Sequence, residues 1–334
     1  MESRVPVQVG EQTGPRLQAA EVEWLAATAQ RIRSSVSRVI IGKDNLIELV
    51  LVAVFSEGHI LFEDVPGIGK TTLAKALARS FDSSFGRIQF TPDLIPSDVT
   101  GISFYNQRSG DFELRQGPII AQVVLADEIN RATPRTQSAL LEAMEERQVT
   151  IEGTTIPLPR PFLVLATQNP IELEGTFPLP EAQLDRFLLR LRVGYPSEED
   201  EDAMLVRFET ENPLDGLEPV VDSTDLVRAI EMTARIHVEP VVRRYLVQIV
   251  RATRAHAGLE LGASPRASLA LLRSARALAA IRGRAYVEPD DVKLVTPQVL
   301  PHRLILASQT RLRGRDAEGI IAEILEQTPV PVEI

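Results

Sequence analysis

Cysteine is absent from this sequence of 334 residues, and histidine is scarce. Without cysteine the chain has no disulfide framework, no thiolate metal site and no cysteine nucleophile. The histidines never stand three or four residues apart, so the sequence has no helical zinc motif. They are His59, His237, His256 and His302. Thiol chemistry and zinc chemistry of the helical type are therefore excluded.

Long apolar runs are also missing. The longest, Leu46–Phe55, contains Glu48 and is far shorter than a bilayer span. The N-terminus carries Glu2 and Arg4 but no apolar segment of the kind that a secretory signal needs. Hydrophobic residues still make up 44% of the chain, which is enough for a substantial core. We therefore expect a cytoplasmic protein with no membrane association.

Positive charge is in deficit overall but concentrated in one region. The net charge is −10 and aromatic residues are 5% of the chain, which disfavours a nucleic-acid partner. Residues 228–315 nevertheless contain 16 basic and six acidic residues. This asymmetry has two interpretations: an ordinary solvated helical surface, or a subunit with a basic end and an acidic end, suited to head-to-tail ring assembly.

Strands and helices alternate through the first part of the chain, which predicts an α/β fold with a parallel sheet covered by helices. Strands are expected at 59–62, 87–90, 121–126, 162–167 and 188–193, and helices at 21–39, 71–81 and 134–147. Two hairpins are expected to interrupt this order. The first joins 102–105 to 112–115, and the second joins 149–151 to 155–158.

The pattern changes after Gly194–Tyr195–Pro196. From there only helical periodicity is found, so an all-helical second domain is expected. Its helices are predicted at 198–209, 225–236, 241–257, 266–284 and 289–300. The expected division is a flexible N-terminal arm (1–20), an αβα core (21–195) and a helical lid domain (196–334).

A glycine-rich loop follows the strand expected at 59–62 and opens the next helix. This is the context of a P-loop, in which backbone N–H groups and a helix N-terminus hold phosphates. Lys70 is expected to bridge the β and γ phosphates of a nucleotide, and Thr71 to supply its hydroxyl to Mg²⁺. Asp64 stands where the P-loop pattern has its first glycine. The alternative to a P-loop is a glycine turn that caps an ordinary helix. The candidate binding residues are Asp64, Pro66, Gly67, Ile68, Gly69, Lys70, Thr71 and Thr72.

Polar residues end two later buried strands. Asp127 and Glu128 follow an apolar run, where Asp127 would hold Mg²⁺ and Glu128 would act on the attacking water. Asn169 ends the next strand and could orient that water, although, taken alone, a turn-forming Asn before proline is the better explanation. Such residues are weak signals alone, but together with the P-loop the acidic pair is strong evidence for a nucleotide site.

Arginines complete the candidate site. Arg186 is the candidate arginine finger, supplied to the nucleotide of an adjacent subunit; a salt bridge to Asp185 or Glu181 is the alternative. Arg266 begins a helix of the second domain, from which it could reach the γ-phosphate. Arg131 is a further candidate, with a simple helix-end contact as the alternative.

These blocks resemble the MoxR family of AAA+ ATPases, and the resemblance extends from about Ile40 to Leu306. The matching segments are Pro66–Thr71, Leu125–Ala132, Thr136–Glu146, Gln168–Glu172, Gly175–Thr176, Leu179–Phe187, Ser264–Arg266, Tyr286 and Pro289–Val292. The resemblance implies Walker A at Lys70 and Thr71, Walker B at Asp127 and Glu128, sensor 1 at Asn169, the arginine finger at Arg186 and sensor 2 at Arg266. It also implies that Asp64 is a tolerated variant.

The same resemblance implies ATP and Mg²⁺ as ligands, a hexameric ring and a chaperone-like ATPase that helps to assemble or mature protein complexes. Partners with von Willebrand factor A domains, which carry a metal-dependent adhesion site, are typical of the family. Ile41 and Gly42 are expected to line the base pocket, but no residue distinguishes ATP from GTP.

Three rival functions remain open at this stage. A helicase-like nucleic-acid motor shares the core and both hairpins, but the hairpin tips at 106–109 and 152–154 carry little basic charge. A magnesium-chelatase-like subunit has related insertions. The third rival is a nucleotide-gated binding module that does not hydrolyse ATP, which the combination of Glu128, Asn169 and Arg186 disfavours.

Overall fold

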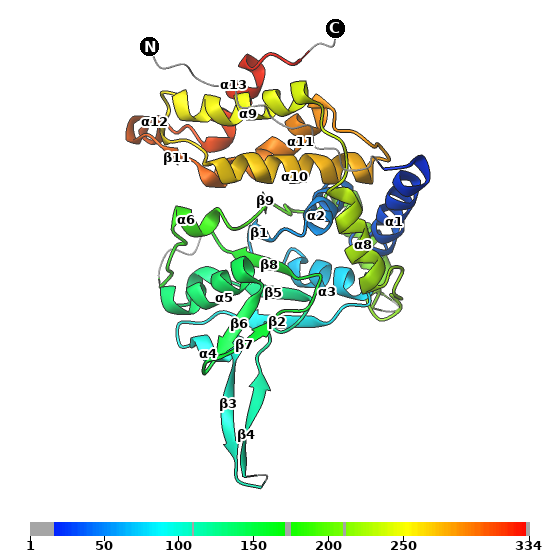
Figure 1. Cartoon of the computed structure of the whole chain (residues 1–334), viewed down its shortest axis with the longest axis vertical. Coiled ribbons are helices and arrows are strands. Elements are labelled where there is room, and N and C mark those ends of the chain that lie inside the picture. Colours follow the sequence, from blue (N-terminus) through cyan, green and yellow to red (C-terminus); the bar gives the residue numbers. More distant parts are fainter. Residues whose placement is uncertain (1–16, 109, 171–174, 210–211, 332–334) are drawn as a thin grey trace, which may run out of the picture.

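The computed structural model describes residues 17–331 apart from 109, 171–174 and 210–211. Most of the arm expected at 1–20 therefore lies outside the described residues, as do Ser109 of the first hairpin and Ile171 and Glu172 of the family motif. The described chain forms three levels in Figure 1: a helical layer, a central sheet with its flanking helices, and a hairpin that points away from both.

The central sheet consists of five parallel strands in the order β2-β5-β8-β1-β9. Their bounds are β1 (Ile60–Glu63), β2 (Phe85–Gln89), β5 (Val123–Asp127), β8 (Leu163–Gln168) and β9 (Leu189–Leu191). All five expected strands are confirmed within a few residues. Most residues of β1, β5 and β8 are buried, because helices cover both faces of the sheet.

The two faces of the sheet belong to two different hydrophobic clusters. On β5, Leu125 packs into one cluster and Val124 into the other, as the strand period of two requires. The first cluster includes α1 (Ala19–Ser37), α2 (Asp44–Phe55) and α3 (Lys70–Ser80). The second includes α4 (Pro96–Thr100) and α5 (Pro134–Glu146). The sheet is therefore the middle layer of three.

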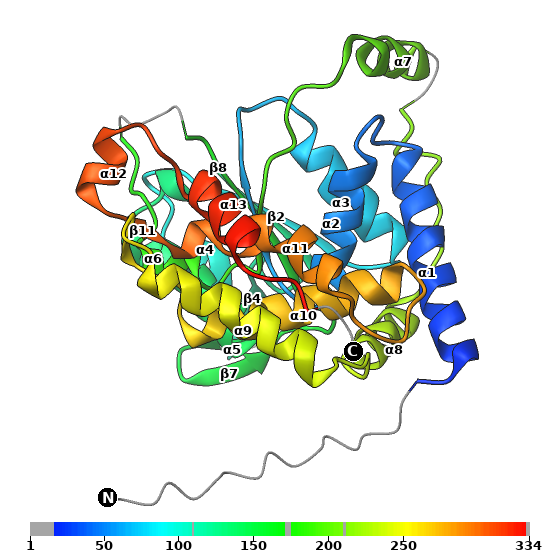
Figure 2. The same cartoon turned by 90° about the horizontal axis from the view of Figure 1, so that it is seen from above.

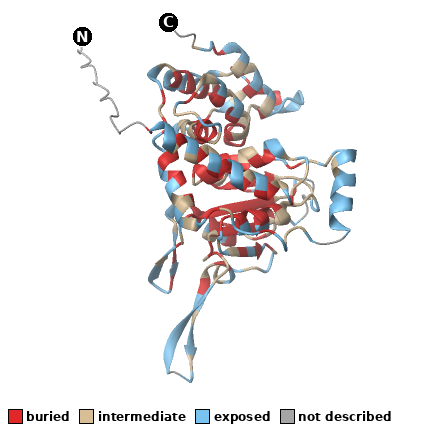
Figure 3. Ribbon diagram, turned by 90° about the vertical axis from the view of Figure 1, so that its right-hand side faces the viewer, coloured by how far each residue is buried: buried red, intermediate tan, exposed pale blue. Residues whose placement is uncertain are grey.

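Both expected hairpins are present. The first is β3 (Gly101–Asn106) with β4 (Asp111–Gln116), and the second is β6 (Gln148–Ile151) with β7 (Thr154–Pro157). The β3–β4 hairpin projects far from the body (Figures 1 and 3), and every residue of β4 is exposed. Near its end, the rings of Tyr105 and Phe112 lie edge to face with centroids 5.4 Å apart. Apolar rings at an exposed end are typical of a contact surface.

The C-terminal part is helical, and all five helices expected there are confirmed. They are α7 (Glu198–Phe208), α8 (Ser223–Thr233), α9 (Pro240–Ala255), α10 (Pro265–Ile281) and α11 (Pro289–Val299). The α7 helix stands away from the body in Figure 2 and has no buried residue. Two further helices were not predicted: α12 (Ser308–Leu312) and α13 (Ala317–Gln327).

The prediction that this part is all-helical is wrong in one place, because it also contains two short strands. Strands β10 (Leu259–Leu261) and β11 (Ile305–Leu306) form a small antiparallel pair with an irregular register. They join the chain after α9 to the chain before α12, where α-helical hydrogen bonding is interrupted. Two and three residues are too few to produce a strand period in the sequence.

The helical part packs directly on the α1–α3 side of the sheet. The N–H groups of Val220 and Val221 donate to the carbonyl of Ser80 at 3.1 and 3.2 Å, and Ser56 Oγ donates to the carbonyl of Arg273 at 3.2 Å. One hydrophobic cluster runs from α2 through α10 without interruption. The boundary between core and lid at residues 195 and 196 therefore stays a prediction. None of the helices in the described ranges combines the length and apolar composition that a bilayer crossing requires.

Candidate nucleotide-binding site

A cavity of about 430 Å³ lies where the carboxyl ends of β1, β5 and β8 meet. Neighbouring parallel strands end at the same sheet edge, which is where open α/β sheets bind ligands. The lining residues are Asp64, Pro66, Gly67, Gly69, Lys70, Thr71, Thr72, Arg87, Gln89, Asp127, Glu128, Thr167, Gln168 and Asn169. The structure thus brings together the P-loop, the acidic pair and Asn169, as the sequence predicts.

The loop before α3 has the conformation of an anion cradle. Gly67 and Gly69 have φ values of +84° and +89°, which residues with a Cβ rarely adopt. A Cβ at either position would have no atom within 4 Å, so the loop borders open space. Gly69 is also the N-cap of α3, whose first N–H groups have no partner within the helix. This cradle fits a phosphate group.

Lys70 occupies this loop with its ammonium group turned to backbone oxygens. Its Nζ donates to the carbonyls of Asp64 and Val65 at 2.9 and 3.1 Å. Burial lowers the pKa of Lys70, and the nearby carboxylates of Asp64, Asp127 and Glu128 oppose that shift. A half-buried cation bonded only to neutral acceptors can exchange them for an anionic phosphate.

The carboxylate of Asp64 accepts hydrogen bonds from two backbone N–H groups. Its Oδ1 accepts from its neighbour Val65 N at 2.9 Å, and its Oδ2 accepts from Gly194 N at 2.7 Å. The backbone of Asp64 lies outside the left-handed region. Glycine is therefore not needed at this position, and the carboxylate instead joins the P-loop to the chain that follows β9.

Thr167 organises the acidic pair from the neighbouring strand. Its hydroxyl donates to Asp127 Oδ1 at 2.7 Å and accepts from Glu128 N at 2.8 Å. Arg87 Nη2 lies 2.9 Å from the second oxygen of Asp127. The Asp127 carboxylate therefore has one neutral and one cationic partner, which fix its orientation at the cavity.

Glu128 is held by two side chains and by its own backbone. Its φ is +57°, in the left-handed region that bulky residues avoid. Its Oε2 accepts from Gln89 Nε2 at 2.8 Å and from Arg131 Nη1 at 3.1 Å. Arg131 ends the 3-10 helix η1 (Ile129–Arg131), so its contact is the helix-end contact weighed as the alternative.

Arg87, Gln89 and Thr167 are site residues that sequence reasoning missed. Residues 87 and 89 are exposed polar positions on either side of the buried Ile88, which is the one signal that they share a face of β2. Parallel pairing then sets Gln89 opposite Asp127. Only the pairing of β2 with β5 shows that Arg87 and Gln89 reach the acidic pair.

Asn169 follows β8 and is buried at the cavity, 9% exposed. Asn130 Nδ2 donates to its backbone carbonyl at 3.4 Å. The side chain thus stands one strand away from Glu128 and on the same edge of the sheet, which is the relation that the sequence predicts for a residue orienting water.

Of the two residues expected to line the base pocket, the structure places one in a cavity. Gly42 lines a second cavity of about 510 Å³, with β9 and α11 on its other sides, whereas Ile41 is not among the lining residues. Ile68 does not line the phosphate cavity and packs against the core. The two cavities are close, because Val193 lines the second and the next residue, Gly194, is bonded to Asp64 of the first.

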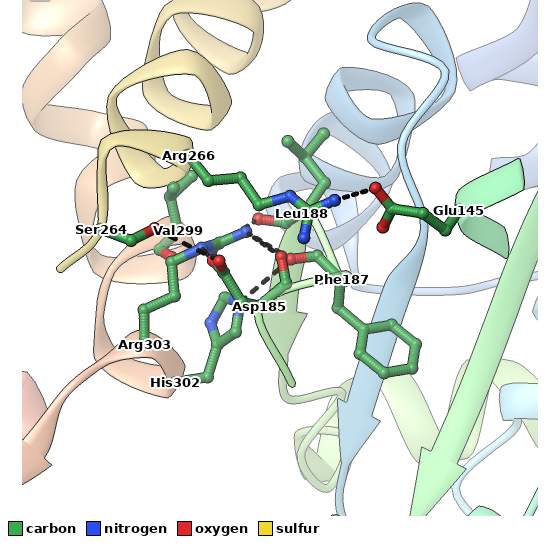
Figure 4. A network of polar contacts seen from close by, with 9 residues as sticks. All are labelled: Glu145, Asp185, Phe187, Leu188, Ser264, Arg266, Val299, His302 and Arg303. Carbon is green, nitrogen blue, oxygen red and sulfur yellow. Dashed lines mark hydrogen bonds and ion pairs between the residues drawn. The ribbon is translucent and has the colours of Figure 1, made fainter. Parts of the chain in front are cut away.

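Arg186 and Arg266 lie together and line neither of the two cavities. Arg186 Nε is 3.7 Å from one carboxylate oxygen of Glu145, and Arg266 pairs with the other. The expected alternative partners of Arg186 were Asp185 and Glu181, and Glu145 takes their place. The packing of α10 sets Arg266 against Glu145 of α5 (Figure 4), and its expected reach to the γ-phosphate stays a prediction.

Comparison with known proteins agrees with this fold. Residues 59–189 match the ATPase family associated with various cellular activities (AAA), and residues 251–324 match the AAA lid domain. A solved structure from Cytophaga hutchinsonii superposes with a TM-score of 0.88 at 39% identity, over 93% of this chain and 97% of that one. The protein is therefore an AAA ATPase with a lid domain.

Curated relatives narrow the class to one family. The chain is 45% identical to Chaperone MoxR1 of Mycobacterium tuberculosis, over 94% of this chain and 84% of that protein. It is 50% identical to the protein YeaC of Bacillus subtilis, over 89% of this chain and 93% of that one. Matching magnesium-chelatase subunits cover only about half of this chain, for example 54% at 31% identity in Arabidopsis thaliana. The chain belongs to the MoxR family of AAA ATPases, and it is an ATP hydrolase.

Proposed function

We propose that this protein is a chaperone-like ATPase that hydrolyses ATP with Mg²⁺ to remodel, assemble or mature protein complexes. The observation that carries this proposal is one cavity lined by the glycine cradle, Lys70, the Asp127–Glu128 pair and Asn169. The relative named Chaperone MoxR1 supports a protein client.

The residues present fit a nucleotide with magnesium. Thr71 and Asp127 line the same cavity and offer the hydroxyl and carboxylate oxygens that Mg²⁺ takes as ligands. Bound there, Mg²⁺ would neutralise charge on the β and γ phosphates. Gly67, Gly69 and Lys70 would hold the phosphates, and the second cavity, with Gly42 at its edge, is the candidate place for the base.

Glu128 is the proposed general base. Its carboxylate would accept the proton of the water that attacks the γ-phosphate, and Asn169 would orient that water. Oε2 of Glu128 accepts from Gln89 and Arg131, which orients the carboxylate and makes Oε1 the oxygen proposed to accept the proton.

Arg186 and Arg266 are proposed to act on the nucleotide of a neighbouring subunit. Both lie on the Glu145 side of the molecule and line neither cavity. A head-to-tail contact would bring this side to the next subunit's phosphates, and repetition of that contact closes a ring. We propose a hexamer for this ring, on the family resemblance, and a cytoplasmic location.

The partner proposed is a protein with a von Willebrand factor A domain and its metal-dependent adhesion site, together with a protein client. The projecting β3–β4 hairpin offers Tyr105 and Phe112 as exposed contacts for such a protein. A nucleic-acid motor is not favoured, since Arg108 is the one basic residue near the tip of this hairpin. A magnesium-chelatase function is not favoured because those relatives match only part of the chain.

The direct test is nucleotide binding and turnover by the purified chain. We expect calorimetry to detect binding of ATP with magnesium. We also expect phosphate release that depends on protein concentration, because subunits must assemble. Lys70→Ala should abolish the binding, whereas Lys75→Ala, at an exposed position five residues further along α3, should not. Absence of binding heat from folded protein with any nucleoside triphosphate and magnesium would overturn the proposal.

A further inference from the structure

One buried arginine ties the segment that carries Arg186 to the helical part of the chain. Arg303 ends the 3-10 helix η2 (Pro301–Arg303), and its side chain is 3% exposed. Its Nε donates to Asp185 Oδ1 at 2.7 Å, and its Nη2 donates to the carbonyl of Phe187 at 2.6 Å. These acceptors are the residues on either side of Arg186. Figure 4 shows the guanidinium pointing toward Asp185 and Phe187.

The remaining donors of Arg303 complete this anchor. Its Nη1 donates to the carbonyl of Leu188 at 3.3 Å and also to that of Val299. His302 Nε2 lies 3.1 Å from the carbonyl of Phe187. Burial lowers the pKa of Arg303 to about 10, while Asp185 opposes the shift, so the guanidinium is charged at neutral pH. A rigid fork with several acceptors fixes a backbone far better than a single ion pair.

Asp185 also contacts the segment that carries Arg266. Ser264 is the N-cap of α10, yet its hydroxyl caps no N–H group of that helix. It donates instead to Asp185 Oδ2, at 3.3 Å. Arg266 stands two residues further on and shares Glu145 with Arg186. One carboxylate thus connects both arginine-bearing segments to Arg303.

We propose that Asp185 and Arg303 are positioning residues that hold Arg186 and Arg266 as one unit and link that unit to the helical part. The position of the helical part then decides whether both arginines reach the neighbouring subunit's nucleotide. This inference rests on the proposed action of Arg186 between subunits. Its physical basis is that catalytic groups tolerate little displacement, since about 1 Å can cost a factor of about 10² in rate.

The first experiment separates positioning from nucleotide binding. Arg303→Lys keeps a positive charge opposite Asp185 but loses the fork that holds the carbonyls around Arg186. In the full-length protein we expect kcat to fall about tenfold or more, with the calorimetric affinity for ADP and magnesium unchanged. Arg284→Lys is the matched control: it changes the ion pair with the buried Asp291, elsewhere in the helical part, and should leave kcat near that of the unmodified protein.

The second experiment mixes subunits. Arg303→Lys subunits keep an intact nucleotide site, and Glu128→Gln subunits keep intact arginines. Mixed assemblies should therefore regain turnover at interfaces where the second kind supplies Arg186 to the first. A merely structural role for Arg303 predicts no regain at any ratio. Ser264→Ala removes one contact to Asp185 without leaving a buried charge, so it gives the same test, with a smaller loss, if Arg303→Lys fails to fold.

The outcomes also separate this inference from the proposed function. If Arg186→Ala regains turnover when mixed with Glu128→Gln but Arg303→Lys does not, the positioning role is wrong and the action of Arg186 between subunits stands. If neither mixture regains turnover, the action between subunits is wrong, and this inference fails with it. Unchanged kcat in folded Arg303→Lys protein, or in Ser264→Ala protein where Arg303→Lys does not fold, also overturns the positioning role.

Discussion

Gln89 donates from its carboxamide to the carboxylate of Glu128 at 2.8 Å, across the pairing of β2 with β5. The same oxygen of Glu128 accepts from Arg131 at 3.1 Å. Two donors on one oxygen fix the orientation of the carboxylate, whose second oxygen, Oε1, is the one proposed to accept the proton from water. The structure therefore holds the proposed base in a defined orientation at the cavity.

Glu128→Gln should separate binding from hydrolysis. Glutamine has nearly the same shape, so the P-loop cavity is retained, but its amide cannot accept a proton. We expect turnover to fall by a factor of about 10² to 10⁴ while ADP affinity stays within a factor of about two. Phosphate release and calorimetry on the same preparation measure both. Glu146→Gln, on the exposed end of α5, is the matched control; turnover retained in Glu128→Gln would remove Glu128 from this role.

Thr167→Val should weaken magnesium-dependent binding. Valine has the size of threonine but neither holds Asp127 Oδ1 nor accepts from Glu128 N. Loss of such outer contacts typically lowers metal affinity by a factor of about 10 to 100. ADP titrations with magnesium and with EDTA should show the loss only when magnesium is present. Thr150→Val, exposed on the β6–β7 hairpin, serves as control, and an equal loss in EDTA would contradict the assignment.

The five strands, both hairpins and the P-loop could be predicted because their signals are local. A buried strand is a short apolar run, and a loop such as 64–72 is recognised from adjacent residues. Helix α2 was missed as a helix for the opposite reason. It is buried over most of its surface, so its sequence has no polar face to reveal a helical period.

The contacts around the acidic pair could not be predicted, because they depend on which strands become neighbours. Gln89 and Thr167 reach Asp127 and Glu128 only through the order β2-β5-β8 in the sheet. The partner of Arg266 depends on how α10 packs against α5, more than 100 residues earlier in the chain. Local sequence patterns do not show which distant segments come into contact in the folded chain.

The β3–β4 hairpin should contribute little to stability. Phe112 is 70% exposed and its ring contacts that of Tyr105, whereas Phe162 is 1% exposed in the core. Phe112→Ala should change the free energy of unfolding by less than about 0.5 kcal/mol. Phe162→Ala should cost about 3 to 5 kcal/mol through lost burial and a cavity. Urea unfolding of both variants checks this contrast, and a large loss in Phe112→Ala would mean that the hairpin packs on the body.

Acid should destabilise the fold through His59, which is buried immediately before β1. Its Nε2 donates to the carbonyl of Met144 at 3.2 Å, and its Nδ1 accepts from Val164 N at 3.0 Å, so both nitrogens of the neutral ring are used. Burial lowers the pKa of His59 from 6.5 to about 4, against a smaller opposing effect of the Met144 carbonyl. Protonation would both bury a charge and break the bond from Val164.

The sign of the pH effect follows from this shift. Between pH 6.5 and about 4 the unfolded chain binds a proton at His59 that the folded chain does not, so stability falls as the pH is lowered through that window. From pH 7 to pH 5 this one group should cost about 2 kcal/mol. Urea unfolding at pH 7, 6 and 5 measures the loss. His59→Gln cannot titrate and should show a shallower dependence, in which the buried His302 still contributes because its pKa is also lowered by burial. An equally steep dependence in His59→Gln would show that other groups cause the loss.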